Sequence, residues 1–250
     1  MNTDTITPLY LNWGFWSFIV SLVALIISLS PHIILWLKGN KLDLEIHNKI
    51  TLHHWVGFPS INIYLGVTNK GRARVKIKSI NVKIVKDGKD IENLSCNGYF
   101  ESTTSQSANL FFPFELSSEE SWDHVCWFAI NLDRNKEQKA RSAFTAVDMN
   151  ISEKIRVNGA NHQLVEADSE LVEVLKEIQN QNFIWESGEY YLELRFETTP
   201  SVILKKRVRF TLFESDVKEL NDYFNDYKFG SVYNHQKNKG VNIQISEGFY

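Results

Sequence analysis

The longest run of apolar positions lies near the start of the chain. Between Trp13 and Leu37 no residue carries a fixed charge. At 1.5 Å per residue, about 25 helical residues reach roughly 37 Å, which exceeds the ~30 Å hydrocarbon core of a bilayer. Three tryptophans near the ends suit the two membrane interfaces: Trp13, Trp16 and Trp36. The pattern predicts a transmembrane helix over residues 13–37, preceded by a short N-terminal tail (residues 1–12).

A cleaved signal peptide is the alternative interpretation of this segment. Signal peptides have a basic N-terminal region, a shorter apolar stretch and a small-residue cleavage site. Residues 1–12 contain no Lys or Arg, and no Ala-x-Ala pattern follows, which favours a retained anchor. The positive-inside rule then predicts a single-pass protein of the cell membrane, with its N-terminus outside and its C-terminal domain in the cytoplasm. The rule applies because basic residues flank only one side of the helix: Lys38, Lys41 and Lys49.

Small residues recur along the apolar segment every three or four positions: Gly14, Ser17, Ser21, Ala24 and Ser28. This spacing places them on one side of the helix, where they allow a second helix to approach closely. We call these five residues the small-residue seam. It predicts that the helix forms a homo-oligomer or docks on another membrane protein. The alternative is that Gly, Ala and Ser are simply common in membrane helices, with serine bonding back to its own turn.

Beyond residue 41 the pattern becomes the alternation of apolar and polar residues that is typical of β-strands. Three early runs show it: LDLEI (42–46), INIYLGV (61–67) and VKIKSINVKIV (75–85). In the third run the apolar face changes parity between Ile77 and Ile80, which predicts a β-bulge near Ser79. The sequence KDGK predicts a hairpin turn. A second hairpin is expected from two late runs: EYYLELRF (189–196) and VILKKRVRFTLF (202–213).

Amphipathic patterns predict two helices that cover a sheet, at residues 168–180 and 215–227. Residues 97–160 contain apolar runs whose connections are not readable, and residues 229–250 are expected to form a loosely held C-terminal tail. Few helices and frequent turns predict a mainly β domain over residues 41–228. The expected architecture is an antiparallel β-sandwich with two covering helices.

Two stretches carry a resemblance to a known fold family. LGVTNKGRARVKIKSI, followed much later by SGEYYLELRF, resembles the early and late strands of immunoglobulin-like domains. In that comparison Tyr190 resembles the corner tyrosine whose hydroxyl bonds back to the chain. The layout also resembles small bacterial membrane proteins with one N-terminal anchor and an immunoglobulin-like, β-rich cytoplasmic domain, and that resemblance implies no activity.

Composition narrows the possible partners. The net charge of −3 is too close to balance to indicate nucleic acid as a partner. Two cysteines, Cys96 and Cys126, exclude a disulfide framework and leave open whether they form one bridge or two reduced thiols. Nucleotide-binding, zinc-protease and hydrolase motifs are absent in their familiar forms, so no cofactor is assigned.

Two groupings of polar residues are candidates for metal binding or catalysis. His53 and His54 are adjacent, so on a strand they point to opposite faces and cannot easily share a metal. Asp123, His124 and Cys126 lie in the apolar run WDHVCW, where core packing is the better interpretation than Cys–His catalysis. No catalytic or metal-binding residue is assigned, and an enzyme would need a site within residues 97–160.

Cations form two alternating rows on predicted strands. The first row comprises Arg72, Arg74, Lys76 and Lys78, and the second comprises Lys205, Arg207 and Arg209. Held near anionic headgroups, each cation gains up to ~1 kcal/mol within a Debye length, and an acidic partner is an equal possibility. The alternative role is solvation and protection of strand edges.

These features favour a membrane-anchored binding, scaffold or sensor protein. Its cytoplasmic domain would engage an unidentified soluble partner, and its helix would self-associate in the bilayer. Two other hypotheses remain: an effector that disrupts the membrane under control of the β-domain, and an enzyme.

Overall fold

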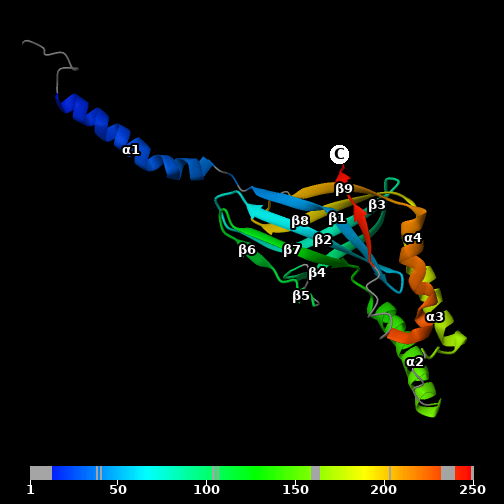
Figure 1. Cartoon of the computed structure of the whole chain (residues 1–250). Helices are drawn as coiled ribbons and strands as arrows, with labels where there is room; N and C mark the ends of the chain where they lie inside the picture. Colours follow the sequence, from blue (N-terminus) through cyan, green and yellow to red (C-terminus); the bar gives the residue numbers. More distant parts are fainter. Residues whose placement is uncertain are drawn as a thin grey trace, which may run out of the picture.

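A computed structural model describes residues 13–37, 39, 41–102, 105, 107–158, 164–202, 204–231 and 240–248. The predicted N-terminal tail (1–12), Lys38 and the side chain of Trp36 lie outside the described part. The chain forms an N-terminal helix, a single curled antiparallel sheet and a group of helices at one end of that sheet (Figure 1).

Helix α1 (Trp13–Leu37) has the bounds that its apolar pattern predicts. The window Trp13–Ser30 has a mean hydropathy of 2.0, and none of its residues is buried. A comparably apolar helix in the core of a soluble domain would be mostly buried. Helix α1 instead extends away from the rest of the chain (Figure 1), and it is long and apolar enough to cross a membrane.

All strands belong to one sheet, which begins and ends with strands of the same C-terminal segment. The order is β10-β1-β2-β7-β4-β3-β8-β9-β11, so the sheet nearly closes into a barrel. The mainly antiparallel β class is confirmed, whereas the immunoglobulin-like sandwich of two sheets is not. The strands are β1 (Leu42–Trp55), β2 (Phe58–Asn69), β3 (Val75–Lys86), β4 (Lys89–Phe100), β5 (Asn109–Leu110), β6 (Phe114–Leu116), β7 (Ser121–Ala129), β8 (Gly188–Thr199), β9 (Lys205–Leu212), β10 (Val241–Gln244) and β11 (Ser246–Glu247).

Several local predictions are confirmed. The pairing of β3 with β8 shifts register between Ile77 and Ser79, which is the expected bulge. The β3–β4 hairpin turns at Gly88, whose φ of 75° suits a residue without a side chain. The hydroxyl of Tyr190 accepts a hydrogen bond from the Glu186 N–H (3.0 Å) and donates to the Glu186 carbonyl (3.1 Å). The corner contact is therefore present in a barrel.

Inward-facing positions of the strands fill the barrel with apolar side chains. On β2 these are fully buried at every second residue: Ile61, Ile63, Leu65 and Val67. Cys96 and Cys126 are also buried and are free thiols, which answers the question of whether they pair. Burial raises the pKa of the Cys126 thiol, and a contact with Cys96 raises it further, so this thiol is not activated.

Two extended segments each bridge a pair of separating strands. Strands β3 and β4 pair near their hairpin but diverge further on. The segment Asn109–Leu116 fills the space between them, because β5 pairs with β4 while β6 pairs with β3. This arrangement accounts for much of the middle region that the sequence left unreadable.

The second bridging segment closes the barrel, and we call Val241–Gly248 the closing segment. Strand β10 pairs with β1, and two residues later β11 pairs with β9. Its alternate side chains are buried in the barrel core: Val241, Ile243 and Ile245. The expectation of a loosely held C-terminal tail is therefore wrong for these residues.

Helices cover the end of the barrel opposite α1 (Figure 1). They comprise α2 (Arg134–Asn158), α3 (Ser169–Asn182), α4 (Glu214–Asn221) and the 3-10 turns η2 (Asp222–Asn225) and η3 (Tyr227–Phe229). Helix α3 confirms the prediction at 168–180. The predicted helix at 215–227 is shorter, and α2 was not predicted. Residues of α2, α3 and η3 form a second apolar cluster against the β1–β2 turn.

Candidate functional site

The first row of predicted cations lies at the end of the barrel that adjoins α1. Strand β1 follows α1 closely and pairs with β2 so that Leu42 lies opposite Asn69. The connection from β2 to β3 (residues 70–74) is therefore at this end, and β3 leads away from it. We call the exposed cations of this connection and of β3 the basic rim: Arg72, Arg74, Lys76 and Lys78.

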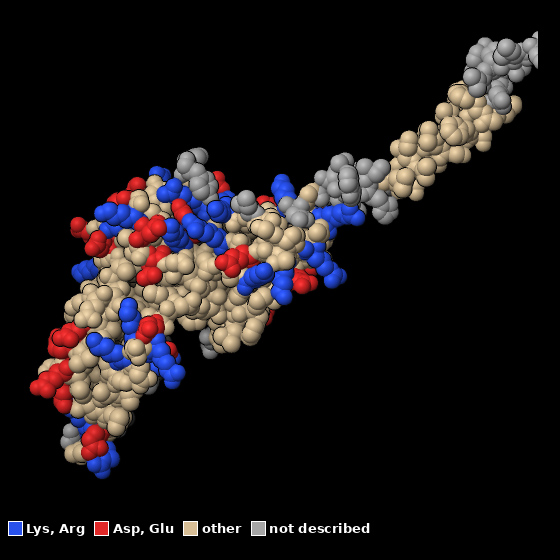
Figure 2. All heavy atoms as spheres, turned by 180° about the vertical axis from the view of Figure 1, so that it is seen from behind, with Lys and Arg blue, Asp and Glu red and all other residues tan. Residues whose placement is uncertain are grey.

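The basic rim has one acidic neighbour in Glu115, which lies opposite Lys76 in the pairing of β6 with β3. None of its four side chains forms an ion pair within the described part of the chain, whereas the neighbouring Lys70 lies 3.9 Å from Glu119. Figure 2 shows Lys and Arg side chains on the barrel surface beside α1, while α1 itself carries no charged residue. All four side chains of the rim are exposed to solvent.

A buried asparagine holds the connection that carries the rim. The Asn69 side chain is fully buried, and its Nδ2 donates to the carbonyls of Ala73 (2.8 Å) and Leu116 (3.0 Å). Its Oδ1 accepts from the Gly71 N–H (2.9 Å), and its own N–H donates to the Glu120 carbonyl (2.9 Å). The Asn69 side chain therefore ties the β2–β3 connection to the end of β6, while its backbone N–H bonds to the residue before β7. Sequence reasoning missed this role, although Asn before Lys-Gly is typical of a turn.

The second row of cations is separate from the rim, because β8 lies between β3 and β9. Lys205 and Arg209 are exposed, but Arg207 is half-buried. Its guanidinium carbon lies 4.1 Å from the centre of the Tyr191 ring, and its Nε lies 3.8 Å from the Glu193 carboxylate. The two rows therefore do not form one surface, and Arg207 packs against two residues of β8, Tyr191 and Glu193.

The two adjacent histidines point to opposite faces of β1, as predicted. His54 is buried, and its Nδ1 accepts from the Gly57 N–H (3.0 Å) while its Nε2 lies 2.7 Å from the Leu220 carbonyl. His53 lies on the outer side, 3.3 Å from the Asn62 amide nitrogen, and burial lowers its pKa. Among the described residues, no group of three His, Cys, Asp or Glu side chains could hold a metal ion.

The WDHVCW run is divided between the two faces of β7. Asp123 points outward and accepts a hydrogen bond from the Tyr64 hydroxyl (3.1 Å), which raises the pKa of Tyr64. His124 packs inward against Tyr99, with their ring centres 4.7 Å apart. The Cys126 thiol lies 3.9 Å from the backbone carbonyl of His124, and the buried Nδ1 of His124 has no hydrogen-bond partner among the described residues, so the pair lacks the thiol–imidazole bond that Cys–His catalysis requires.

No protein-family model matches this chain. No curated protein matches its sequence either. Its function is therefore proposed from its own surfaces.

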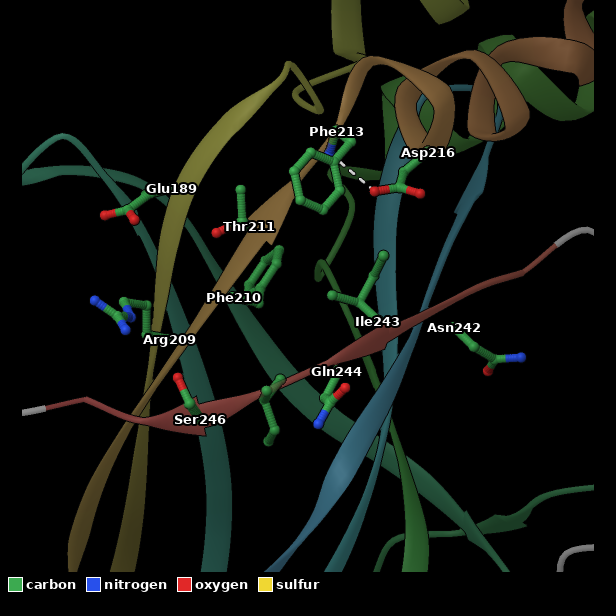
Figure 3. Close-up of a pocket in the computed structure, with 11 residues that line it drawn as sticks. Glu189, Arg209, Phe210, Thr211, Phe213, Asp216, Asn242, Ile243, Gln244 and Ser246 are labelled. Atoms are coloured by element: carbon green, nitrogen blue, oxygen red, sulfur yellow. Dashed lines mark hydrogen bonds between the residues drawn. The ribbon is translucent and has the colours of Figure 1, made fainter.

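A cavity of about 440 Å³ opens between β9 and the closing segment (Figure 3). Its floor is apolar and includes Phe210, Ile243 and Ile245, which are buried. Phe213 and Asp216 stand at the end nearest α4, where the Asp216 carboxylate accepts from the Phe213 N–H (2.8 Å). Of the predicted site residues only Arg209 lines this cavity. The sequence did not indicate this cavity, because one of its walls is the closing segment, which was expected to be a loosely held tail.

Proposed function

We propose that the protein is a single-pass membrane protein in which α1 crosses the bilayer and the barrel binds a partner in the cytoplasm. The observation that carries this proposal is that none of the residues Trp13–Ser30 of the 25-residue apolar helix α1 is buried. Burial against lipid supplies the apolar environment that the rest of the chain does not. The described surfaces offer exposed cations and an open cavity rather than an activated catalytic group.

The short connection after α1 supports a position of the barrel at the lipid surface. Residues 38–41 separate α1 from β1, and four extended residues span at most about 14 Å. The basic rim lies at the same end of the barrel, so it stands near the headgroups when α1 is inserted. Each of its cations then gains up to ~1 kcal/mol with anionic lipid, and salt screens this gain.

The small-residue seam supports self-association of α1. Its members are exposed along the helix. Ser30, which lies off the seam, donates to the Ile27 carbonyl (2.8 Å), whereas Ser17, Ser21 and Ser28 have no hydrogen-bond partner among the described residues. These hydroxyls are thus available to a second helix, where polar contacts between helices contribute about 0.6 to 2 kcal/mol.

The double substitution Ser21→Leu with Ala24→Leu tests the seam. It is expected to weaken self-association roughly tenfold, because two leucines hold the backbones apart. The matched control is Val23→Leu with Ile26→Leu, which places two leucines on the opposite side of α1. Crosslinking of lysines in intact membranes should give an oligomer for the wild type and the control and a monomer for the seam variant. The same oligomer in all three would remove the seam from the proposal.

A further inference from the structure

The register of the closing segment defines which of its backbone groups face the cavity. The Ile245 N–H donates to the Asn48 carbonyl (2.8 Å), in line with the pairing of β10 and β1. Backbone groups of an antiparallel strand alternate in direction from one residue to the next. Asn242 and Gln244 therefore direct their N–H and C=O groups away from β1, toward β9.

Strand β9 presents the complementary edge. The Gly248 N–H donates to the Arg207 carbonyl (3.1 Å), and Ser246 pairs with Arg209. By the same alternation, Thr211 directs its N–H and C=O toward the closing segment, but it lies beyond the last residue of β9 that β11 pairs. In the described part of the chain, no strand pairs these groups of Thr211, Asn242 and Gln244. The cavity is thus a gap between two open strand edges (Figure 3).

The fold contains a filled counterpart of this gap. Where β3 and β4 separate, the extended segment Asn109–Leu116 lies between them and pairs with both. Within the described residues, no such segment lies between β9 and β10 beyond the Arg209–Ser246 pair. An extended chain is therefore the occupant that this sheet already uses for a gap of this kind.

We propose that the gap between β9 and the closing segment binds a short extended peptide of a partner protein by strand addition. Backbone hydrogen bonds to Thr211, Asn242 and Gln244 hold the peptide, as in other cases of β-augmentation. The apolar floor formed by Phe210 and Ile243 selects an apolar side chain at the inward position. This site would be the partner-binding site of the proposed function. The proposal rests on that function only for the location of the partner in the cytoplasm.

Selection from a phage-displayed library of random ten-residue peptides tests the inference. The target is the full chain in lipid nanodiscs. The expected result is a set of peptides with an apolar residue at one position and saturable binding. N-methylation of alternate peptide bonds should weaken binding at least tenfold, because it removes the donors that pair with a strand edge. Equal binding of the N-methylated peptides, or no enrichment, overturns strand addition and in the first case indicates a side-chain pocket.

Paired substitutions at one position separate the backbone from the side chain. Thr211→Pro removes the N–H that faces the gap without removing a bond to β8, and it should weaken the selected peptides at least tenfold. Thr211→Val keeps the N–H and should change binding less than threefold. Gln244→Pro with Gln244→Val repeats the comparison from the other edge, and thermal unfolding verifies that each variant is folded. Equal affinities for the proline and valine variants overturn the proposed backbone pairing.

The outcomes for the site and for the membrane anchor are distinguishable. Release of the chain from membranes contradicts the anchor. If the released chain still binds the selected peptides, the peptide site stands. If the chain stays in the membrane but enriches no peptide, only the peptide site is contradicted.

Discussion

Truncation of the chain after Gly240 is expected to unfold the barrel at room temperature. It removes the strands that pair with both β1 and β9, together with three buried side chains: Val241, Ile243 and Ile245. Burying each aliphatic side chain contributes about 1.5–3 kcal/mol, so the loss is roughly 5–9 kcal/mol. That loss is comparable to the total stability of about 5–15 kcal/mol typical of a domain. Far-ultraviolet circular dichroism and urea unfolding of the chain in nanodiscs measure the effect.

A graded pair of substitutions verifies that the closing segment acts through its inward face. Ile243→Ala should lower the free energy of unfolding by about 2–4 kcal/mol, because a buried isoleucine leaves a cavity. Gln244→Ala, at the adjacent exposed position, should change it by less than about 0.5 kcal/mol. A truncated chain with the wild-type unfolding transition would show that the barrel does not depend on this segment.

Substitution of Asn69 by alanine is expected to destabilise the chain about as much as Ile243→Ala. It leaves the carbonyls of Ala73 and Leu116 and the N–H of Gly71 without their partner. An unsatisfied buried polar group costs about 1–3 kcal/mol, and partial access of water to the loop reduces the sum. The free energy of unfolding should therefore fall by about 2–4 kcal/mol in urea denaturation.

The same substitution should also free the connection that carries Arg72 and Arg74. Hydrogen exchange of residues 70–74 should accelerate more than that of β2, because the loop loses its fixed support. Asn93→Ala is the matched control, since Asn93 is exposed and its side chain makes no hydrogen bond among the described residues. A loss of stability as small for Asn69→Ala as for Asn93→Ala would contradict the role of Asn69.

Local features of the fold were predictable wherever neighbouring residues determine them. The uncharged run over residues 13–37, the parity change near Ser79 and the Asp-Gly turn each depend on a few adjacent positions. Closure of the sheet depends on pairing residues 49–52 with 241–244, which no local pattern specifies. Alternating strands suit a sandwich and a barrel equally, so the sequence could not distinguish them. The run VNIQI (241–245) did alternate, but its polar surroundings suggested a loose tail.

The candidate surfaces were predictable only in part, for the same reason. Exposure of Lys76 and Lys78 followed from the alternation along β3, whereas Arg72 and Arg74 lie in the connection before β3, where the intervening Ala73 is exposed as well. The separation of Lys205 and Arg209 from that row depends on β8 lying between β3 and β9, which is a matter of topology. The cavity combines residues of β9 with residues of the closing segment. It could be found only once the sheet was seen to close.

Alkaline carbonate extraction of membranes from cells that make the full chain tests the central claim most directly. A helix that spans the bilayer keeps its protein in the membrane pellet after peripheral contacts are broken at high pH. The account predicts that the chain stays in the pellet with an intact mass that includes residues 13–37. Release of the chain into the supernatant, or a mature N-terminus beyond Pro31, would contradict the account.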